Sequence, residues 1–92
     1  MKTEERTFTI VNRLGLHARA AAKLVQTASK FRSDVVLERE GQIANGKSIM
    51  GVLMLAAAQG TELKVRATGE DAEEAIAAVG SLIEDGFGED RG

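Results

Sequence analysis

The chain has 92 residues, of which 43% are hydrophobic and 28% are charged, and its formal net charge is −2. This length fits one domain, over residues 1–92, with room for one hydrophobic core but little for a deep substrate cavity. A slightly acidic balance, with three phenylalanines as the only aromatic residues, argues against nucleic-acid binding. Without cysteine the chain has no disulfide, no thiol nucleophile and no thiolate metal site.

Two further features bear on location. The longest apolar run, residues 52–58, is far too short to span a bilayer. The charged residues 1–6 lack the apolar core of a signal peptide. We therefore expect a cytoplasmic protein that does not insert into a membrane.

The first half of the chain predicts a strand, a helix and two more strands. Residues 7–11 are rich in β-branched side chains, which is typical of a strand. In residues 18–30 apolar side chains recur at helical spacing, which predicts an amphipathic helix. Residues 34–40 alternate between apolar and polar side chains, and a tight turn at 40–41 leads into a short strand over 42–44.

The second half predicts a helix, a strand and a last helix. Ser48 is expected to cap a helix that runs from residue 49 to about 57, with Gly60 as its C-terminal stop. Residues 61–68 alternate in polarity and predict a strand. Residues 68–71 resemble a capping box that opens the last helix.

Gly86 is expected to end that helix, and the polar, glycine-rich residues 87–92 are expected to form a flexible tail. The resulting order is β-α-β-β-α-β-α. Because the strands alternate in polarity, one face of the sheet should be wet, and three helices with one apolar stripe each should cover the other face. The expected fold is α+β, a two-layer open-faced sandwich.

The only histidine, His17, lies where the first predicted helix begins. A lone histidine is a weak signal, and a surface or capping role is the plainer interpretation. At a helix start, however, free backbone N–H groups and the positive end of the macrodipole favour a bound phosphate. Arg19 adds a planar guanidinium that suits phosphate oxygens, and Gly15 allows a sharp turn just before the site. Because neutral imidazole is nucleophilic near pH 7, these residues predict a phosphohistidine site.

The chain lacks the groups that a stand-alone enzyme would need beside this histidine. It has no second histidine, and no paired carboxylates or metal-ligand set lie near His17 in the sequence. We therefore expect no metal and no cofactor. The chemistry predicted is that of a phosphocarrier with a transient phosphohistidine, not of an independent enzyme.

Two segments resemble a known family. Residues 15–19 (GLHAR) closely resemble the active-site segment of HPr, the phosphocarrier of the bacterial phosphoenolpyruvate-dependent sugar phosphotransferase system. Residues 47–52 (KSIMGV) resemble the family's second signature, around its regulatory serine. The 30 residues between His17 and Ser48 are also similar to the family's spacing, and the likeness covers nearly the whole chain.

The resemblance implies a four-stranded antiparallel sheet in the order 1-4-2-3. It also implies that Enzyme I phosphorylates His17 on Nδ1, that Arg19 steadies the phosphoryl group, and that an enzyme IIA receives it. We expect the carrier to be a monomer.

A partner-binding patch is implied as well, over Ala22, Ile49, Met50 and Leu53. Core packing is an equal alternative for Ile49 and Leu53, because they lie four residues apart on one predicted helix. Met50 is out of phase with that stripe, and its adaptable thioether suits an exposed surface with two partners.

Ser48 has two interpretations. It is a plain N-cap, or it is also a phosphorylation site, because its surroundings resemble the HPr branch that a dedicated HPr kinase/phosphorylase regulates. Phosphoserine would place about two negative charges beside the docking patch. Because desolvating those charges is costly, phosphorylation should slow transfer through His17.

Ala20 departs from the family pattern, since HPr proteins usually have proline directly after the arginine. Alanine is a good helix former, so the fold should survive, but the identity of the partners is left open. One alternative is a carrier of the nitrogen-related regulatory branch. Another is a regulatory binding module that acts through phospho-Ser48, although family members of that kind lack the histidine.

Overall fold

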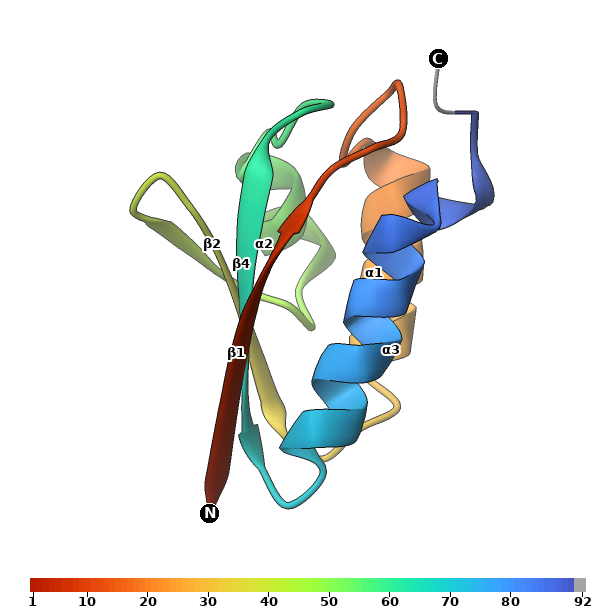
Figure 1. The fold of residues 1–92 in the computed structure, drawn as a ribbon. Helices are drawn as coiled ribbons and strands as arrows, with labels where there is room; N and C mark the ends of the chain where they lie inside the picture. The colour runs from red at the N-terminus through yellow and green to blue at the C-terminus, as the bar shows by residue number, and fades with distance from the viewer. Residues whose placement is uncertain (91–92) are drawn as a thin grey trace.

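A computed structural model of the chain describes residues 1–90, and residues 91 and 92 lie outside the described part. The elements in chain order are β1 (Lys2–Thr9), α1 (Ala18–Ala28), β2 (Asp34–Arg39), β3 (Gln42–Asn45), α2 (Ile49–Met54), β4 (Glu62–Gly69), α3 (Ala72–Glu84) and the short 3₁₀ helix η1 (Gly86–Gly88). This is the predicted order β-α-β-β-α-β-α, followed by one added turn (Figure 1).

The four strands form one antiparallel sheet in the order β1-β4-β2-β3, which confirms the implied order. β1 pairs with β4 along its whole length, from Lys2 opposite Gly69 to Thr9 opposite Glu62. β4 also pairs with β2, which in turn forms a hairpin with β3. The last strand in the sequence therefore lies inside the sheet and joins the two halves of the chain.

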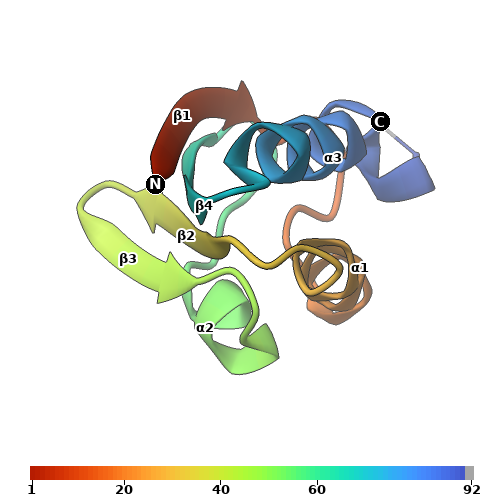
Figure 2. The same cartoon turned by 90° about the horizontal axis from the view of Figure 1, so that it is seen from below.

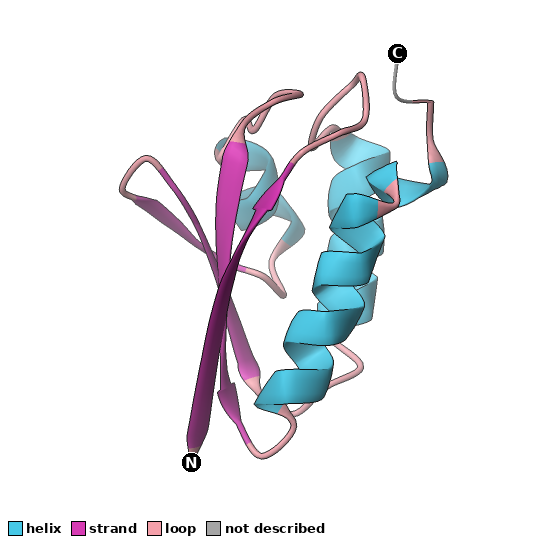
Figure 3. Cartoon of the chain, viewed as in Figure 1, coloured by secondary structure: helices cyan, strands magenta, loops and turns pink. Residues whose placement is uncertain are grey.

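The helices cover one face of this sheet and leave the other open, as the alternating strands predict (Figures 2 and 3). In β4 every second residue is buried, and Leu63 and Val65 are inaccessible to solvent. Ala21 and Leu24 of α1 are equally buried and belong to the same core cluster. The α+β two-layer sandwich is thus confirmed, with its core between the layers.

Some element boundaries differ from those predicted. β1 begins at Lys2 instead of residue 7, because pairing with β4 extends a strand whose own first residues are charged and mostly exposed. α2 ends at Met54, well before residue 57. Ala56 adopts a φ of 51°, in the left-handed region, which a right-handed helix cannot continue. Gly60 is therefore not the stop of this helix.

The predicted capping box for α3 is also wrong. Thr68 is paired within β4, and the cap residue is Asp71, whose side chain makes no hydrogen bond to α3. Its carboxylate instead accepts hydrogen bonds from the backbone N–H groups of Arg32 and Ser33, each at 2.9 Å, and from the Ser33 hydroxyl. Asp71 therefore fastens the loop between α1 and β2 to the start of α3.

This role makes stability depend on pH. The hydrogen bond from the Ser33 hydroxyl, followed by that from the Arg32 N–H, lowers the pKa of Asp71 from 3.8 to about 2. A lowered pKa gives a stabilising contribution that is complete well above pH 3.8 and is lost as the pH falls through about 2.

We expect Asp71→Asn to lower the melting temperature at pH 7, because an amide offers one acceptor oxygen where the carboxylate offers two. The difference from the unaltered chain should shrink as the pH falls from about 4 to 2. Thermal unfolding followed by circular dichroism at several pH values measures it. A difference that stays constant down to pH 2 would contradict the assigned role.

Within residues 85–90, the segment after α3 is held against the body, which corrects the expectation of a flexible tail from residue 87. Phe87 is only 1% exposed. The Nζ group of Lys23 in α1 donates a hydrogen bond to the Phe87 carbonyl oxygen at 2.7 Å. Burying one phenylalanine contributes about 1.5–3 kcal/mol, which is enough to hold a short segment against the body. The last two residues of the predicted tail, 91 and 92, lie outside the described residues.

Candidate functional site

The loop that leads from β1 to α1 is held on both sides. The buried Asn12 donates a hydrogen bond from Nδ2 to the carbonyl oxygen of Gly15 at 2.8 Å. The Leu16 N–H donates to the carbonyl oxygen of Ala57, after α2, at 2.9 Å. These contacts fix the backbone immediately before His17.

Gly15 permits this arrangement in two ways. Its φ is 65°, in the left-handed region, and a Cβ added there would lie 2.5 Å from the Ala57 carbonyl oxygen. We expect Gly15→Ala to destabilise the fold by about 3 kcal/mol, since left-handed backbone costs about 1–2 kcal/mol and overpacking costs about 1–3 kcal/mol. Urea denaturation measures the loss.

Gly60→Ala is the matched control for this substitution. Gly60 has a φ of 88°, but no heavy atom lies within 4 Å of the added Cβ. Only the backbone penalty of about 1–2 kcal/mol should therefore appear. If both variants lost the same free energy of unfolding, the close approach of Gly15 to Ala57 would not contribute to stability.

His17 is the N-cap residue of α1, in extended backbone conformation. The first intrahelical hydrogen bond runs from the Ala21 N–H to the His17 carbonyl oxygen at 2.8 Å. The side chain of His17 does not cap the helix, and the first turn contains no acidic residue. The free N–H groups at the start of α1 therefore remain available to an anion beside the ring.

A shallow hollow of about 650 Å³ lies beside His17. Its lining comes from the loop, the first turn of α1 and the chain after α3, namely Arg13, Leu14, His17, Ala18, Arg19, Gly88, Glu89 and Asp90. The structure thus brings the two predicted residues, His17 and Arg19, to one hollow. Arg19 is exposed, and the His17 side chain is 28% exposed.

The C-terminal segment contributes a carboxylate to this hollow. Oε2 of Glu89 lies 2.6 Å from Nε2 of His17, and Oε1 accepts a hydrogen bond from Asn12 Nδ2 at 3.0 Å. Burial opposes ionisation of Glu89, but the hydrogen bonds from Asn12 and His17, with the positive charge of Lys23, lower the pKa of Glu89 overall. Glu89 is therefore ionised at neutral pH.

Sequence reasoning missed Glu89, because residues 87–92 were assigned to a tail. The available signal was Phe87, a large apolar residue between two glycines directly after a helix. An aromatic side chain in such a polar segment marks an anchor to the core, and an anchor brings the next residues near the body.

Ser48 caps α2 as predicted, since its hydroxyl oxygen accepts a hydrogen bond from the Gly51 N–H at 3.1 Å. The next two side chains are apolar and exposed. Ile49 is 45% exposed and Met50 is 68% exposed. Leu53 is half-buried and packs against the core. Exposure of Met50 is thus confirmed, and core packing is wrong for Ile49 but partly right for Leu53.

Two further exposed apolar side chains lie on α2 and beside His17. Met54, at the end of α2, is 70% exposed, and Leu14, beside His17, is 63% exposed. Ala22 is half-buried on α1, which packs against α2. We call Leu14, Ile49, Met50 and Met54 the apolar surface. Single exposed apolar residues are common, but several on neighbouring elements are typical of a protein-binding site.

Ala20 is fully buried, and α1 begins at the predicted residue without the proline of the family pattern. Its methyl group lies in the core below the site. The structure does not test which partners the chain binds, so the partners themselves stay predictions.

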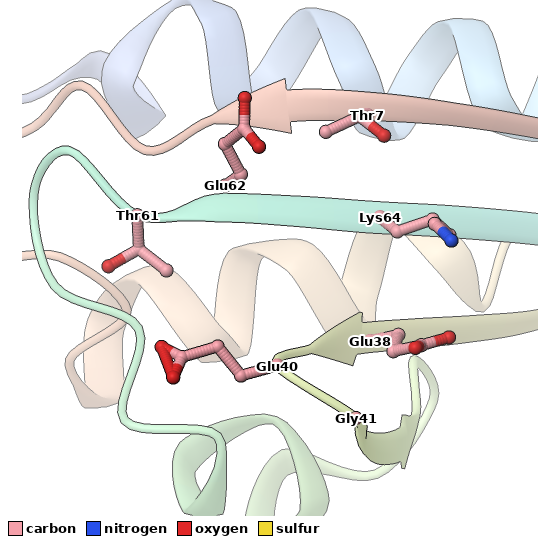
Figure 4. A pocket seen from close by; sticks show the side chains of 7 residues that line it. All are labelled: Thr7, Glu38, Glu40, Gly41, Thr61, Glu62 and Lys64. Atoms are coloured by element: carbon pink, nitrogen blue, oxygen red, sulfur yellow. The ribbon is translucent and has the colours of Figure 1, made fainter.

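A second hollow lies on the open face of the sheet, away from the helices (Figure 4). Its lining residues are Thr7, Glu38, Glu40, Gly41, Thr61, Glu62 and Lys64. Figure 4 shows Glu40 and Glu62 on different sides of the opening, so their carboxylates do not converge on one centre. This hollow holds none of the predicted site residues, whereas the hollow beside His17 holds both His17 and Arg19 and is therefore the candidate site.

Comparison with known proteins shows which family the chain resembles. Residues 4–85 match the family described as the PTS HPr component phosphorylation site. The phosphocarrier protein HPr of Xylella fastidiosa strain Temecula1 is 55% identical over 86 residues, covering 94% of this chain and 97% of the relative. The HPr of Neisseria meningitidis serogroup B is 48% identical over 85 residues, covering 92% and 96%.

Solved structures show the same likeness. An HPr from Thermoanaerobacter tengcongensis is 50% identical, with a TM-score of 0.91 over 95% of this chain and 98% of that one. The domain-swapped dimer of Bacillus subtilis Crh is 44% identical, with a TM-score of 0.74 over 80% of this chain and 85% of that one. A monomeric state stays a prediction. Within residues 1–90, no helix is both long and apolar enough to cross a membrane.

Proposed function

Because the chain belongs to the HPr family of phosphocarrier proteins of the phosphotransferase system, we propose that it accepts a phosphoryl group on His17 from Enzyme I and passes it to an enzyme IIA. One observation supports this most: the partly exposed ring of His17 shares a hollow with Arg19 at the start of α1. A nucleophile, a fixed positive charge and free backbone donors meet there.

The surroundings favour transfer over hydrolysis. Within the described residues, the hollow contains no second histidine and no metal-ligand cluster. The two carboxylates that line it, Glu89 and Asp90, come from the C-terminal segment, and Glu89 is engaged with His17 and Asn12. In a phosphohistidine the imidazole is a good leaving group. An acceptor that a partner brings can therefore take the phosphoryl group.

The apolar surface is the proposed docking site for both partners. Leu14 lines the hollow itself, and Ile49 and Met50 follow Ser48 at the start of α2. Because α1 and α2 pack against each other, one partner can cover these side chains and the hollow together. Covering apolar area of this kind contributes about 25 cal/mol for each Å² removed from water.

Ser48 is the proposed control point. Its hydroxyl lies at the helix start, directly before Ile49 and Met50. The kinase/phosphorylase of the family would add a phosphate there, and the start of α2 would tolerate the charge. The same charge would be desolvated when a partner covers the apolar surface, so phospho-Ser48 would weaken docking.

The test follows the phosphoryl group through two transfers. The chain is incubated with Enzyme I and labelled phosphoenolpyruvate, and an enzyme IIA is then added. We expect an acid-labile, base-stable phosphate on the chain that moves to the enzyme IIA. An acid-stable phosphate, or a label that the enzyme IIA cannot remove, would overturn the proposal.

A further inference from the structure

The contact between His17 and Glu89 links the candidate site to the end of the chain. Glu89 Oε2 lies 2.6 Å from Nε2 of His17, although 72 positions separate the two residues in the sequence. The Glu89 side chain is only 16% exposed, so the contact is partly shielded from water. Charge-assisted hydrogen bonds of this kind are about twice as strong as neutral ones.

Several independent contacts hold Glu89 in place. Phe87 is buried in the core, and its carbonyl oxygen accepts a hydrogen bond from Lys23 Nζ. The Glu89 N–H donates to the Gly86 carbonyl oxygen at 2.9 Å. On the other side, the Arg13 N–H donates to the Asp90 carbonyl oxygen at 3.0 Å. The carboxylate is therefore positioned by its backbone on both sides.

An ionised carboxylate can only accept hydrogen bonds, so Nε2 of His17 must carry the proton in this contact. In a neutral imidazole the other nitrogen, Nδ1, then holds a free lone pair. Within residues 1–90 no group hydrogen-bonds Nδ1. The contact thus selects one of the two tautomers, the one in which Nδ1 is the nucleophile.

We propose that Glu89 is a positioning residue that holds His17 in its Nε2–H tautomer and so presents Nδ1 to the phosphoryl group. The proposal rests on the proposed function of His17. In the transfer, the Nδ1 lone pair forms the N–P bond, while the bond between phosphorus and the donor breaks and its electron pair stays with the donor. The proton on Nε2 does not move, and the positive charge that the ring gains faces the Glu89 carboxylate.

Onward transfer reverses these steps. The acceptor's lone pair attacks phosphorus, the N–P bond breaks, and its electron pair returns to Nδ1. The ring is again neutral with its proton on Nε2, so the carrier needs no proton exchange between cycles.

Glu89→Gln tests the proposal most directly, because Asn12 determines the orientation of the new glutamine side-chain amide. Asn12 Nδ2 donates both to the Gly15 carbonyl oxygen and to Glu89. The glutamine oxygen must therefore face Asn12, and its NH₂ group faces Nε2 of His17. Since NH₂ is a donor, Nε2 becomes the acceptor and the proton moves to Nδ1. Glu89→Ala, by contrast, leaves the ring free to adopt either tautomer.

The readout is the pair of imidazole ¹⁵N chemical shifts of His17, measured at about pH 8.5, where an ordinary imidazole is neutral. Asp85→Asn removes one exposed carboxylate directly after α3, four residues before Glu89, and is the matched control for net charge. We expect the Nε2–H form in the unaltered chain and in Asp85→Asn, and the Nδ1–H form in Glu89→Gln. Phosphorylation by Enzyme I should fall about tenfold or more in Glu89→Gln, through kcat, and less in Glu89→Ala.

Unchanged ¹⁵N shifts in Glu89→Gln would overturn the positioning role, and they would leave the proposed function intact if His17 is still phosphorylated. A tautomer change in a chain that Enzyme I never phosphorylates on His17 would instead reject the proposed function. Thermal unfolding of each variant shows whether it is folded. If Glu89→Gln does not fold, Glu89→Ala and Asp85→Asn still test the positioning role. Equal imidazole ¹⁵N shifts of His17 in those two variants would also overturn it.

Discussion

Replacing His17 with alanine is expected to abolish phosphorylation by Enzyme I. The reason is chemical, because His17 is the only histidine in the chain and no cysteine can replace it as a nucleophile. Arg19, in the same hollow, cannot replace it, because a guanidinium is a hydrogen-bond donor with no free lone pair to accept a phosphoryl group. Incorporation of labelled phosphate from phosphoenolpyruvate should therefore fall to background.

The fold should survive this substitution. The His17 side chain is 28% exposed, and the one hydrogen bond that its ring makes within residues 1–90 is the contact with Glu89. Losing that bond costs about 1–3 kcal/mol, less than the stability of a typical domain. Arg19→Ala is the comparison variant, since it keeps the nucleophile. It should be phosphorylated more slowly but still to completion, and label retained in His17→Ala would reject the assignment.

A negative charge at Ser48 is expected to slow phosphorylation of His17 by about 10–100-fold, because docking must desolvate that charge. Ser48→Asp places a carboxylate directly before Ile49 and Met50, which are 45% and 68% exposed. The carboxylate can still cap α2, so the helix should persist. Steady-state kinetics with Enzyme I should show the effect in KM, since the variant weakens docking and leaves the chemistry at His17 unchanged.

Ser48→Ala separates the charge from the loss of the hydroxyl. It removes the hydrogen bond from the Gly51 N–H and should cost about 1 kcal/mol of stability. Its KM should match that of the unaltered chain, because no charge is added. If Ser48→Ala and Ser48→Asp raised KM equally, the effect would come from the cap and not from desolvation of the charge.

The parts of this structure that sequence predicted well are those with local signals. The start of α1 follows from the change to helical spacing after His17, and the start of α2 follows from Ser48, whose cap acts within three residues. Alternation along β4 shows which residues face the helices. These features need only neighbouring residues, so they can be recognised without the fold.

The features that sequence did not predict depend on contacts between distant segments. The sequence around Asp71 resembles a capping box, but its carboxylate accepts a hydrogen bond from Ser33, 38 residues away. The sequence around Glu89 resembles a flexible tail. The buried side chain of Phe87 anchors this segment, so the Glu89 carboxylate contacts His17. In each case the sequence suggests a local role for an acidic side chain. In the folded protein that side chain instead contacts a partner that is distant in the sequence.

The proposed carrier atom of the phosphoryl group is Nδ1 of His17. The most direct measurement is nuclear magnetic resonance of the ¹⁵N-labelled chain after phosphorylation by Enzyme I, observing ³¹P and the imidazole nitrogens together. We predict a phosphoramidate ³¹P signal coupled to Nδ1 of His17, with the proton of the ring still on Nε2. A phosphate on Nε2, on Ser48 or on any other residue would contradict this assignment.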